Sequence, residues 1–335
     1  MKLTMREIAK MAGVSITTVS LVLNDKEARI SQKQRTKIKN IARENNYVPN
    51  SSAVSLAKNE SKTIGVIVPN INNPFYSSLI KAISDDLANH GYYALIINSN
   101  DNHENESRQV DQLVNRGVDG ILLVPSNDLY AQGTDVVTAF LNNIKIPFVL
   151  VNANSALPIN QVNLDNVKGG YLATESLIEN GHTKIAIVTG KKGFVNAEER
   201  LLGYKKALEA YNLPFNPKLV FRASYDLDGG FYIIPKIQAT EVSAIFFCSD
   251  LMLYGAVKQF NENHKNLFEQ YSVIGYDDTF FNDVFNPTIT SVKQDVFDLG
   301  RKAVKVLYDT LTKQTVTKEK LTVDLKIRQS VKKIN

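Results

Sequence analysis

The stretch SITTVSLVLN, residues Ser15 to Asn24, decides how the beginning of the chain folds. It follows Gly13, a residue that can adopt the positive φ with which helices end. The hydroxyl of Ser15 can accept a backbone N–H and so begin a new helix. In that helix, one side carries the apolar residues Val19, Val22 and Leu23. The stretch therefore predicts a short helix that begins directly after a tight turn and buries one face.

Hydroxyl and carboxylate spacing on both sides of this stretch predicts two more helices. Thr4-Met5-Arg6-Glu7 has the form of a capping box and predicts a first helix near residues 5–11. The same form recurs from Ser31 to Gln34 and opens a third helix, which should end before Tyr47-Val48-Pro49. The first segment of the chain is therefore expected to be a three-helix unit in which the first two helices meet across a short turn.

Charge is distributed unevenly along the 335 residues. Residues 1–62 contain twelve Lys or Arg and five Asp or Glu, a net charge of about +7, whereas the whole chain carries +5. The remainder is therefore slightly acidic, at about −2. A compact basic segment suits a polyanion such as DNA, because contacts to phosphates release counterions. A solvated lysine-rich face would give the same charge, so charge alone leaves both interpretations open.

The second helix should expose small side chains near its beginning. If its apolar face is buried, the residues turned toward solvent are Ile16, Thr17, Thr18, Ser20 and Leu21. In a helix-turn-helix this turn enters the major groove, where hydroxyls approach base edges and apolar groups meet thymine methyls. The alternative is that these residues are the ordinary surface of a stable three-helix bundle.

Composition excludes several classes of protein. A hydrophobic content of 44% in 335 residues predicts two or three domains. No apolar run approaches the roughly 20 residues that cross a bilayer, and Glu7 and Lys10 stand where a signal peptide would be apolar. We therefore expect a soluble, cytoplasmic protein without a membrane partner. The single Cys248 and four scattered histidines predict no disulfide, no metal site and no cofactor.

After residue 62, short apolar runs alternate with helical segments. The runs are 64–68, 94–97, 121–124, 148–151, 185–188, 219–221, 244–247 and 273–274. Such runs suit parallel strands that are covered on both faces, so the fold class is α/β with two doubly wound lobes. Polar residues follow the strands, and in parallel sheets these ends meet at the edge where ligands bind. Phe75, Tyr76 and Tyr225 could cover a sugar ring there, although turn formation is an alternative role for any single polar residue.

The head resembles the helix-turn-helix of the lac-repressor family of bacterial transcription regulators. The resemblance lies in Met5-Arg6-Glu7-Ile8-Ala9, Ala12-Gly13-Val14-Ser15, Thr18-Val19-Ser20 and Leu23-Asn24. Further on, Asn46-Tyr47-Val48-Pro49-Asn50 and Ala53-Val54-Ser55-Leu56-Ala57 look like the end of the family's third helix and its hinge. Leu21 and Val54 depart from the family, in which basic residues are common at these two positions.

The resemblance implies a set of DNA-binding residues. They are Thr4, Ser15, Ile16, Thr17, Thr18, Ser20, Leu21, Asn24, Arg29, Asn50, Ala53 and Leu56. The hinge, residues 50–57, is too short and serine-rich to be a stable isolated helix. It could fold in a minor groove with Leu56 as a wedge between base pairs. A plain linker is the alternative.

The resemblance extends to the body, where it implies a cleft for a small-molecule effector. Asn72-Asn73-Pro74-Phe75, Arg200, Ser249-Asp250 and Gly275-Tyr276-Asp277-Asp278 match the family's effector loops. The expected effector-binding residues are Asn72, Phe75, Asn152, Arg200, Tyr225, Ser249, Asp277 and Gln294. Arg200 and Asp277 could hold a polyol or a carboxylate through paired hydrogen bonds, and a structural salt bridge between them is the alternative.

The implied architecture is a DNA-binding head and a body of periplasmic-binding-protein type. The head is 1–59 with the hinge at 50–57, and the body is 60–335. We expect the first lobe at about 60–160 and 291–320, and the second at about 161–290 and 321–335. The segment 289–294 is expected to return to the first lobe and 321–327 to the second. The family fold and the absence of a leucine heptad tail imply a homodimer.

These features predict a sequence-specific DNA-binding regulator. We expect a repressor of carbohydrate-metabolism genes that binds a pseudo-palindromic operator and responds to a sugar or sugar phosphate. The alternative is a sugar receptor of the transport type. Catalysis is not expected: adjacent aspartates such as Asp277 and Asp278 point to opposite sides of a strand, and Gly190-Lys191-Lys192-Gly193 lacks the spacing of a phosphate loop.

Overall fold

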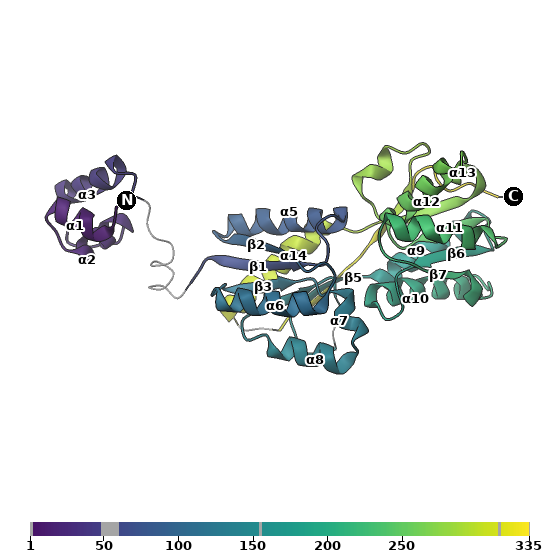
Figure 1. Cartoon of the computed structure of the whole chain (residues 1–335), viewed down its shortest axis with the longest axis horizontal. Helices are drawn as coiled ribbons and strands as arrows, with labels where there is room; N and C mark the ends of the chain where they lie inside the picture. Colours follow the sequence, from purple (N-terminus) through teal and green to yellow (C-terminus); the bar gives the residue numbers. More distant parts are fainter. Residues whose placement is uncertain (1–2, 48–59, 154–155, 314–315, 335) are drawn as a thin grey trace. The chain divides into compact units, whose positions relative to one another are not determined.

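The structure is a computed structural model that describes residues 3–47, 60–153, 156–313 and 316–334. Its contacts divide the chain into two units, Met1–Ser61 and Lys62–Asn335, called here the head and the body. Figure 1 shows the helices and strands of both units. Within the described residues, no helix is both long enough and apolar enough to cross a membrane.

The head contains the three predicted helices. They are α1 (Met5–Ala12), α2 (Ile16–Leu23) and α3 (Gln32–Glu44). Thr4 and Glu7 form a complete capping box, and Gly13 ends α1 with a φ of 71°. Ser15 then caps α2 by accepting the N–H of Thr18. The short turn predicted from the sequence is therefore built as expected.

One small apolar core holds the head together. Its buried members come from all three helices: Ile8, Ala9, Ala12, Val19, Val22, Ile38 and Ala42. Leu23 packs against this core and is only partly buried. Because these residues recur at helical spacing, each helix presents its opposite side to solvent.

The body contains two lobes, each with a six-stranded sheet. The first sheet has the order β11-β5-β4-β3-β1-β2, and all of its paired strands are parallel. Its strands are β1 (Thr63–Val68), β2 (Tyr93–Asn98), β3 (Gly120–Leu123), β4 (Phe148–Val151), β5 (Gln161–Leu164) and β11 (Lys318–Leu321). Its helices are α5 (Pro74–Asn89), α6 (His103–Asn115), α7 (Asn127–Ala131), α8 (Thr134–Asn143) and α14 (Val296–Lys313). Helices α5 and α14 cover one face, and α6, α7 and α8 cover the other (Figure 1).

The second sheet has the order β12-β10-β9-β8-β6-β7. Only β12 runs antiparallel, to its neighbour β10, among the strand pairs described. Its strands are β6 (Ile185–Thr189), β7 (Val220–Arg222), β8 (Ala244–Phe247), β9 (Ser272–Asp277), β10 (Thr290–Lys293) and β12 (Asp324–Lys326). Its helices are α9 (Asn166–Glu179), α10 (Val195–Ala210), α11 (Leu227–Gln238), α12 (Asp250–Glu262) and α13 (Leu267–Gln270), with 3-10 turns η1 (Pro217–Leu219) and η2 (Phe280–Asp283). The fold class predicted from the sequence is confirmed.

The strand pairings correct two expectations about the lobes. Strand β10, within 289–294, pairs with β9 in the second sheet, so the expectation that this segment returns to the first lobe was wrong. The chain returns with α14, which packs on α5. Strand β5, at 161–164, pairs with β4 and belongs to the first sheet, not to the second lobe. Both segments mix polar and apolar residues, a pattern that fits a strand of either sheet, so the local sequence could not identify the partner strand.

Helices α9 and α10 pack closely because glycines lie at their contact. A Cβ at Gly170 would lie 2.1 Å from the carbonyl oxygen of Arg200, and one at Gly203 would lie 2.1 Å from that of Val167. No side chain fits into either space without moving a backbone. These two glycines therefore fix the position of Arg200 relative to α9.

We predict that Gly203→Ala destabilises the body by about 1–3 kcal/mol, since the methyl group must push α9 and α10 apart. The free energy of unfolding from urea titrations measures the change. Lys206→Ala, at an exposed position of the same helix, is the control and should stay within about 0.5 kcal/mol of the wild type. A Gly203→Ala protein as stable as the control would contradict the close contact.

Candidate functional site

The first turn of α2 is the exposed part of the helix-turn-helix. Ile16 is 49% exposed and Thr17 is also exposed. Thr18, Ser20 and Leu21 are partly exposed. The hydroxyls of Ser15 and Thr18 lie 2.8 Å apart and form a hydrogen bond. Five of the predicted DNA-binding residues thus lie outside the core on one short helix, close enough to approach one duplex together.

The other predicted DNA-binding residues of the head differ in whether their side chains already form hydrogen bonds within the head. The hydroxyl of Thr4 donates to Glu7 Oε2 at 2.8 Å, and the amide of Asn24 donates to the carbonyl of Ser20 at 2.8 Å. Arg29 is exposed. Asn50, Ala53 and Leu56 fall outside the described residues. Thr4 and Asn24 therefore have a part in the local fold beside any contact with DNA.

The body contains a cavity of about 190 Å³ at the carboxyl ends of strands of both sheets. Seven of the eight predicted effector residues line it, namely Phe75, Asn152, Arg200, Tyr225, Ser249, Asp277 and Gln294. Asn72 does not; it is exposed, and its N–H donates to the side chain of Asn70. Asn70 and Asn73 line the cavity instead, and Asn73 also caps α5 by accepting the N–H of Phe75.

Arg200 is a buried cation held by neutral groups. Only 4% of the residue is exposed. Its Nε donates to Asn166 Oδ1 at 3.0 Å, its Nη1 donates to the carbonyl of Cys248 at 2.6 Å, and its guanidinium carbon lies 3.7 Å from the centre of the Tyr276 ring. Burial opposes the charge, but Tyr276, Tyr225 and Asp277 nevertheless raise the pKa of Arg200 above its ordinary value. The guanidinium is therefore charged at the wall of the cavity.

Asp277 faces the same cavity without forming a salt bridge to Arg200. Its carboxylate accepts hydrogen bonds from Gln294 Nε2 at 2.6 Å and from Ser249 Oγ at 3.2 Å. No ion pair within 4.0 Å joins it to Arg200 in the described part of the chain. Burial raises the pKa of Asp277 above its ordinary value, and the nearby charge of Arg200 opposes the rise. The two groups are thus held separately, each on its own partners.

Several polar atoms at the cavity lack a partner within the described residues. Asn152 Oδ1, Asn196 Oδ1 and Gln294 Oε1 are buried without a hydrogen bond. Burying such an acceptor without a hydrogen bond costs about 1–3 kcal/mol of folding free energy. A ligand with several hydroxyl donors would satisfy them.

The structure adds Asp101 and Asn127 to the cavity, which the sequence did not single out. The carboxylate of Asp101 accepts the backbone N–H of Asn127 at 2.7 Å and also its side-chain amide. Behind them, the fully buried Glu106 accepts the N–H of Ser126 at 2.6 Å and its hydroxyl at 3.0 Å. Burial raises the pKa of Glu106 to about 7, against the effect of the Ser126 hydrogen bonds. Polar strand ends were the available signal, but they did not say which residues turn inward.

Two family models together match nearly the whole chain. The model for bacterial regulatory proteins of the lacI family matches residues 4–50, and the model for periplasmic binding proteins and the sugar binding domain of the LacI family matches residues 61–330. The chain belongs to the LacI family. It is a DNA-binding transcriptional regulator, with the exposed turn of α2 in the matched head and the polar cavity in the matched body.

Named relatives of this LacI-family chain are repressors. It is 32% identical over 339 residues to the HTH-type transcriptional repressor PurR of Haemophilus influenzae (strain PittEE), with 99% of each chain covered. It is 30% identical over 336 residues to PurR of Mannheimia succiniciproducens, again with 99% of each chain covered. These relatives are transcriptional repressors, not enzymes.

Solved LacI-family structures share the fold. The lac repressor dimer bound to operator and the anti-inducer ONPF is 26% identical, with a TM-score of 0.87 over 99% of this chain and 100% of that chain. The regulator CelR in complex with cellobiose is 28% identical, with a TM-score of 0.72 over 98% and 100% of the chains. A LacI-family regulator of Enterococcus faecium with bound ribose is 28% identical, with a TM-score of 0.72 over 82% and 100%.

We predict that Glu106 makes stability depend on pH. Because its folded pKa is raised from the ordinary 4.5 to about 7, its contribution to stability is complete below about pH 4.5 and is lost as the pH rises toward 7. Relative to Glu106→Gln, the wild-type free energy of unfolding should fall by about 3 kcal/mol across this interval. Parallel pH curves for the two proteins would contradict this. Glu104→Gln, on an exposed position of the same helix, controls for the loss of one charge.

Proposed function

We propose that this LacI-family regulator is an operator-binding repressor whose body closes on an uncharged sugar. The observation that carries the proposal is the presence, in one chain, of an exposed hydroxyl-rich helix turn and a polar cavity between two lobes. Occupation of the cavity by effector and occupation of the head by DNA must then be linked, each changing the affinity for the other by the same factor.

The head has the chemistry of a major-groove reader. The side chains of Ile16 and Thr17 stand clear of the core, and Thr17 and Thr18 carry hydroxyls that can bond base edges or phosphates. Four cations of the described head have partners within it. Arg35 donates to the carbonyls of Lys26 and Ala28, and Lys37 donates to that of Ala12. Lys39 pairs with Asp25, and Arg43 donates to the amide oxygen of Asn40. The remaining exposed cations would supply the salt-dependent attraction to phosphates.

The cavity favours a neutral polyol over a sugar phosphate. Its lining includes two cations, Arg200 and Lys191, and three carboxyl groups, Asp101, Asp226 and Asp277. A phosphate would bring a charge of about −1.5 to −2 toward this carboxyl-rich wall. Hydroxyl donors, by contrast, match the unpartnered amide oxygens, and the aromatic side chains of the lining can cover the apolar face of a sugar ring. The cellobiose and ribose complexes of other family members agree with this choice.

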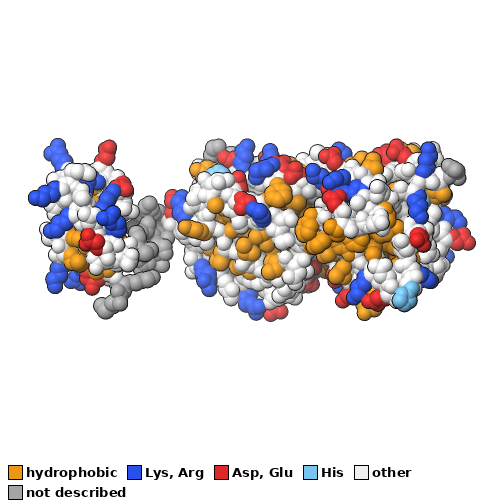
Figure 2. Space-filling view, turned by 90° about the horizontal axis from the view of Figure 1, so that it is seen from above, with side chains coloured by type: hydrophobic (Ala, Val, Ile, Leu, Met, Phe, Trp, Pro, Cys, Tyr) orange, Lys and Arg blue, Asp and Glu red, His pale blue; other side chains and the backbone are white. Residues whose placement is uncertain are grey.

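A homodimer would explain the apolar side chains that the body exposes. Figure 2 shows hydrophobic side chains gathered over both lobes on one face of the body. The exposed residues include Tyr93 and Ile96 on β2, Phe280 and Phe281 on η2, and Val284, which is 76% exposed. Exposed apolar area of this kind marks protein interfaces. A dimer would also present two heads to a pseudo-palindromic operator.

A sugar receptor of the transport type is the alternative, because the body belongs to a family that also includes periplasmic binding proteins. A transport receptor would not explain the presence of the helix-turn-helix. Sequence-specific DNA binding distinguishes the two functions directly. Control of carbohydrate-metabolism genes belongs to the favoured proposal and would follow from the identity of the sugar and the operator.

For DNA binding, we predict that Thr17→Ala weakens binding to an operator selected by the wild type from a random duplex pool, by about tenfold, since a base-edge contact contributes about 1–3 kcal/mol. Fluorescence anisotropy at several salt concentrations gives the affinities. Thr36→Ala, at an exposed threonine of α3, is the matched control and should bind as the wild type does. Equal, salt-insensitive binding of all duplexes by the wild type would refute operator recognition.

For the effector, we predict that an uncharged sugar raises the melting temperature of the wild type and does not raise that of Asp277→Asn. A ligand at 100 times its Kd stabilises the folded state by about 2.7 kcal/mol. A thermal-shift panel of ribose, cellobiose, other sugars, their phosphates and nucleobases tests this. Asn72→Ala lies outside the cavity and should keep the response. A response confined to phosphates or nucleobases would replace the proposed effector class.

A further inference from the structure

Two neighbouring residues at the end of β9 have an unusual backbone. Asp277 has a φ of 116° and Asp278 a φ of 53°, a region that residues with a Cβ rarely occupy. Such conformations persist only where the surroundings hold them in place, and they gather at functional sites. Here the turn presents the Asp277 carboxylate to the cavity.

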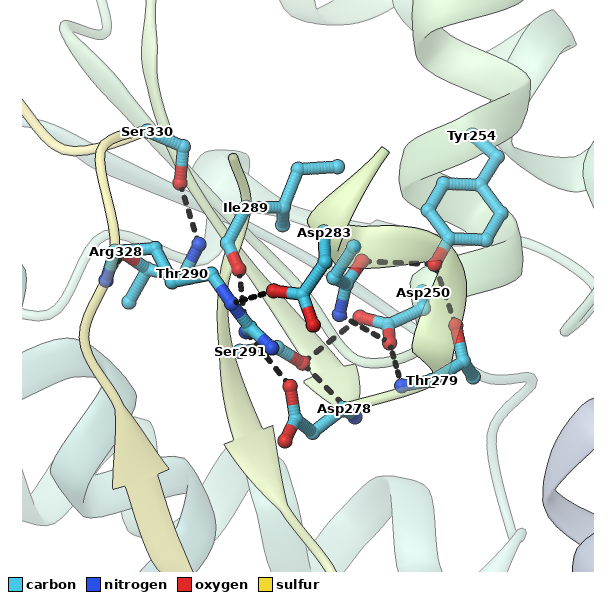
Figure 3. Close-up of polar contacts among 11 residues, drawn as sticks. Asp250, Tyr254, Asp278, Thr279, Asp283, Ile289, Thr290, Ser291, Arg328 and Ser330 are labelled. Carbon is cyan, nitrogen blue, oxygen red and sulfur yellow. Dashed lines mark hydrogen bonds and ion pairs between the residues drawn. The ribbon is translucent and has the colours of Figure 1, made fainter. Parts of the chain in front are cut away.

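Asp250 holds the turn from one side (Figure 3). Its fully buried carboxylate accepts three hydrogen bonds: from Thr279 N–H at 2.9 Å, Asn282 Nδ2 at 2.8 Å and Ser291 Oγ at 2.8 Å. The oxygen of Ser291 in turn accepts the N–H of Asp278 at 3.1 Å. The hydrogen bonds of Asp250 and Ser291 therefore hold the backbone that follows Asp277.

Arg328 holds the turn from the other side and reaches two carboxylates at once. Its Nη1 lies 2.7 Å from Asp278 Oδ1 and donates to the carbonyl of Ile289 at 2.7 Å. Its Nε donates to Asp283 Oδ1 at 2.7 Å. Figure 3 shows the guanidinium between the two aspartates. Although burial opposes it, the two aspartates raise the pKa of Arg328 above its ordinary value. The side chain therefore bridges the two aspartates as a permanent cation.

The two carboxylates lead to different parts of the body. Asp278 adjoins Asp277, which lines the cavity, whereas Asp283 is the last residue of η2, whose Phe280 is 70% exposed. Neither Asp283 nor Arg328 lines the cavity. Arg328 also follows β12, the strand that the chain enters directly after leaving β11 in the first sheet. It thus stands where the crossover between lobes, the cavity turn and the exposed aromatic turn meet.

We propose that Arg328 is a positioning residue that couples the effector cavity to the apolar face of the second lobe. The guanidinium makes the turn at Asp277–Asp278 and the η2 turn move as one body. The role as a coupler of effector and dimer rests on the proposed function, while the mechanical link between the two turns does not.

The link requires both arms of Arg328 and is not explained by stability alone. The side chains of Arg328 and Asp278 are each 7% exposed, whereas that of Asp283 is 59% exposed. Exposed ion pairs contribute little to stability, so removing Asp283 should leave the fold intact. If Arg328 only stabilises the lobe, a change at Asp283 has no effect at Asp278. If Arg328 couples the turns, a change at Asp283 alters the backbone mobility at Asp278.

Amide hydrogen exchange and sedimentation of the full chain test the link without any effector. In Asp283→Asn we expect the Asp278 and Thr279 amides to exchange about tenfold faster, with the melting temperature unchanged. Asp278→Asn changes the cavity side of the link. In this variant we expect the dissociation constant of the dimer to rise about fivefold, a factor in the usual range for coupled sites. Arg328→Lys keeps the positive charge but loses the planar guanidinium that contacts two carboxylates at once, so it should show part of both effects. Arg108→Lys, at an exposed arginine of α6 in the first lobe, is the matched control and should show neither.

The outcomes separate the link from the proposed function. Unchanged exchange at Asp278 and Thr279 in a folded Asp283→Asn protein overturns the link, whatever the oligomeric state. A wild-type protein that sediments as a monomer refutes the proposed homodimer, and the exchange measurement then decides the link alone. A dimer whose dissociation is the same in Asp278→Asn and in the wild type overturns coupling to the interface. If Arg328→Lys does not fold, the two aspartate variants still give the answer.

Discussion

The guanidinium of Arg200 is a charged group buried in the second lobe, and several groups at the cavity wall compensate for the cost of burying that charge. An unpaired buried charge is costly, and here no carboxylate neutralises it directly within the described residues. The amide of Asn166, the carbonyl of Cys248 and the face of Tyr276 compensate instead. Asn166 Oδ1 also accepts the hydroxyl of Tyr276 at 3.2 Å, so these neutral groups fix one another. Asp277 keeps its own hydrogen bonds and remains open toward the cavity.

Glycine makes this arrangement possible. At Gly170 and Gly203, α9 and α10 approach until no Cβ fits between them, and Arg200 lies on the backbone that forms this contact. A similar restriction holds at Gly275, where a Cβ would lie 2.1 Å from Asp250 Oδ1. Close contacts at these glycines thus help to place the buried polar groups of the second lobe.

Local patterns in the sequence predicted the elements better than their partners. The ranges 148–151 and 244–247 are the bounds of β4 and β8, because continuous apolar runs identify buried strands. Strand β11, Lys318–Leu321, was missed because it lies at a sheet edge and carries charges. In the cavity, residue types at strand ends were informative, and the family resemblance selected Arg200 and Asp277. Choosing Asn73 over Asn72, or finding Asp101, required knowing which side chain turns inward, and that depends on helix caps and distant partners.

The burial of Cys248 has a practical consequence for studying this regulator. It is the chain's only cysteine, it lies wholly inside the second lobe, and burial raises the pKa of its thiol to about 12. Thiolate is the reactive form, so alkylating dyes would leave the folded protein almost unmodified. Two cysteines, one introduced on the surface of each lobe, would then be the only labelled positions. Distances between the lobes could be followed by spectroscopy in an otherwise native chain.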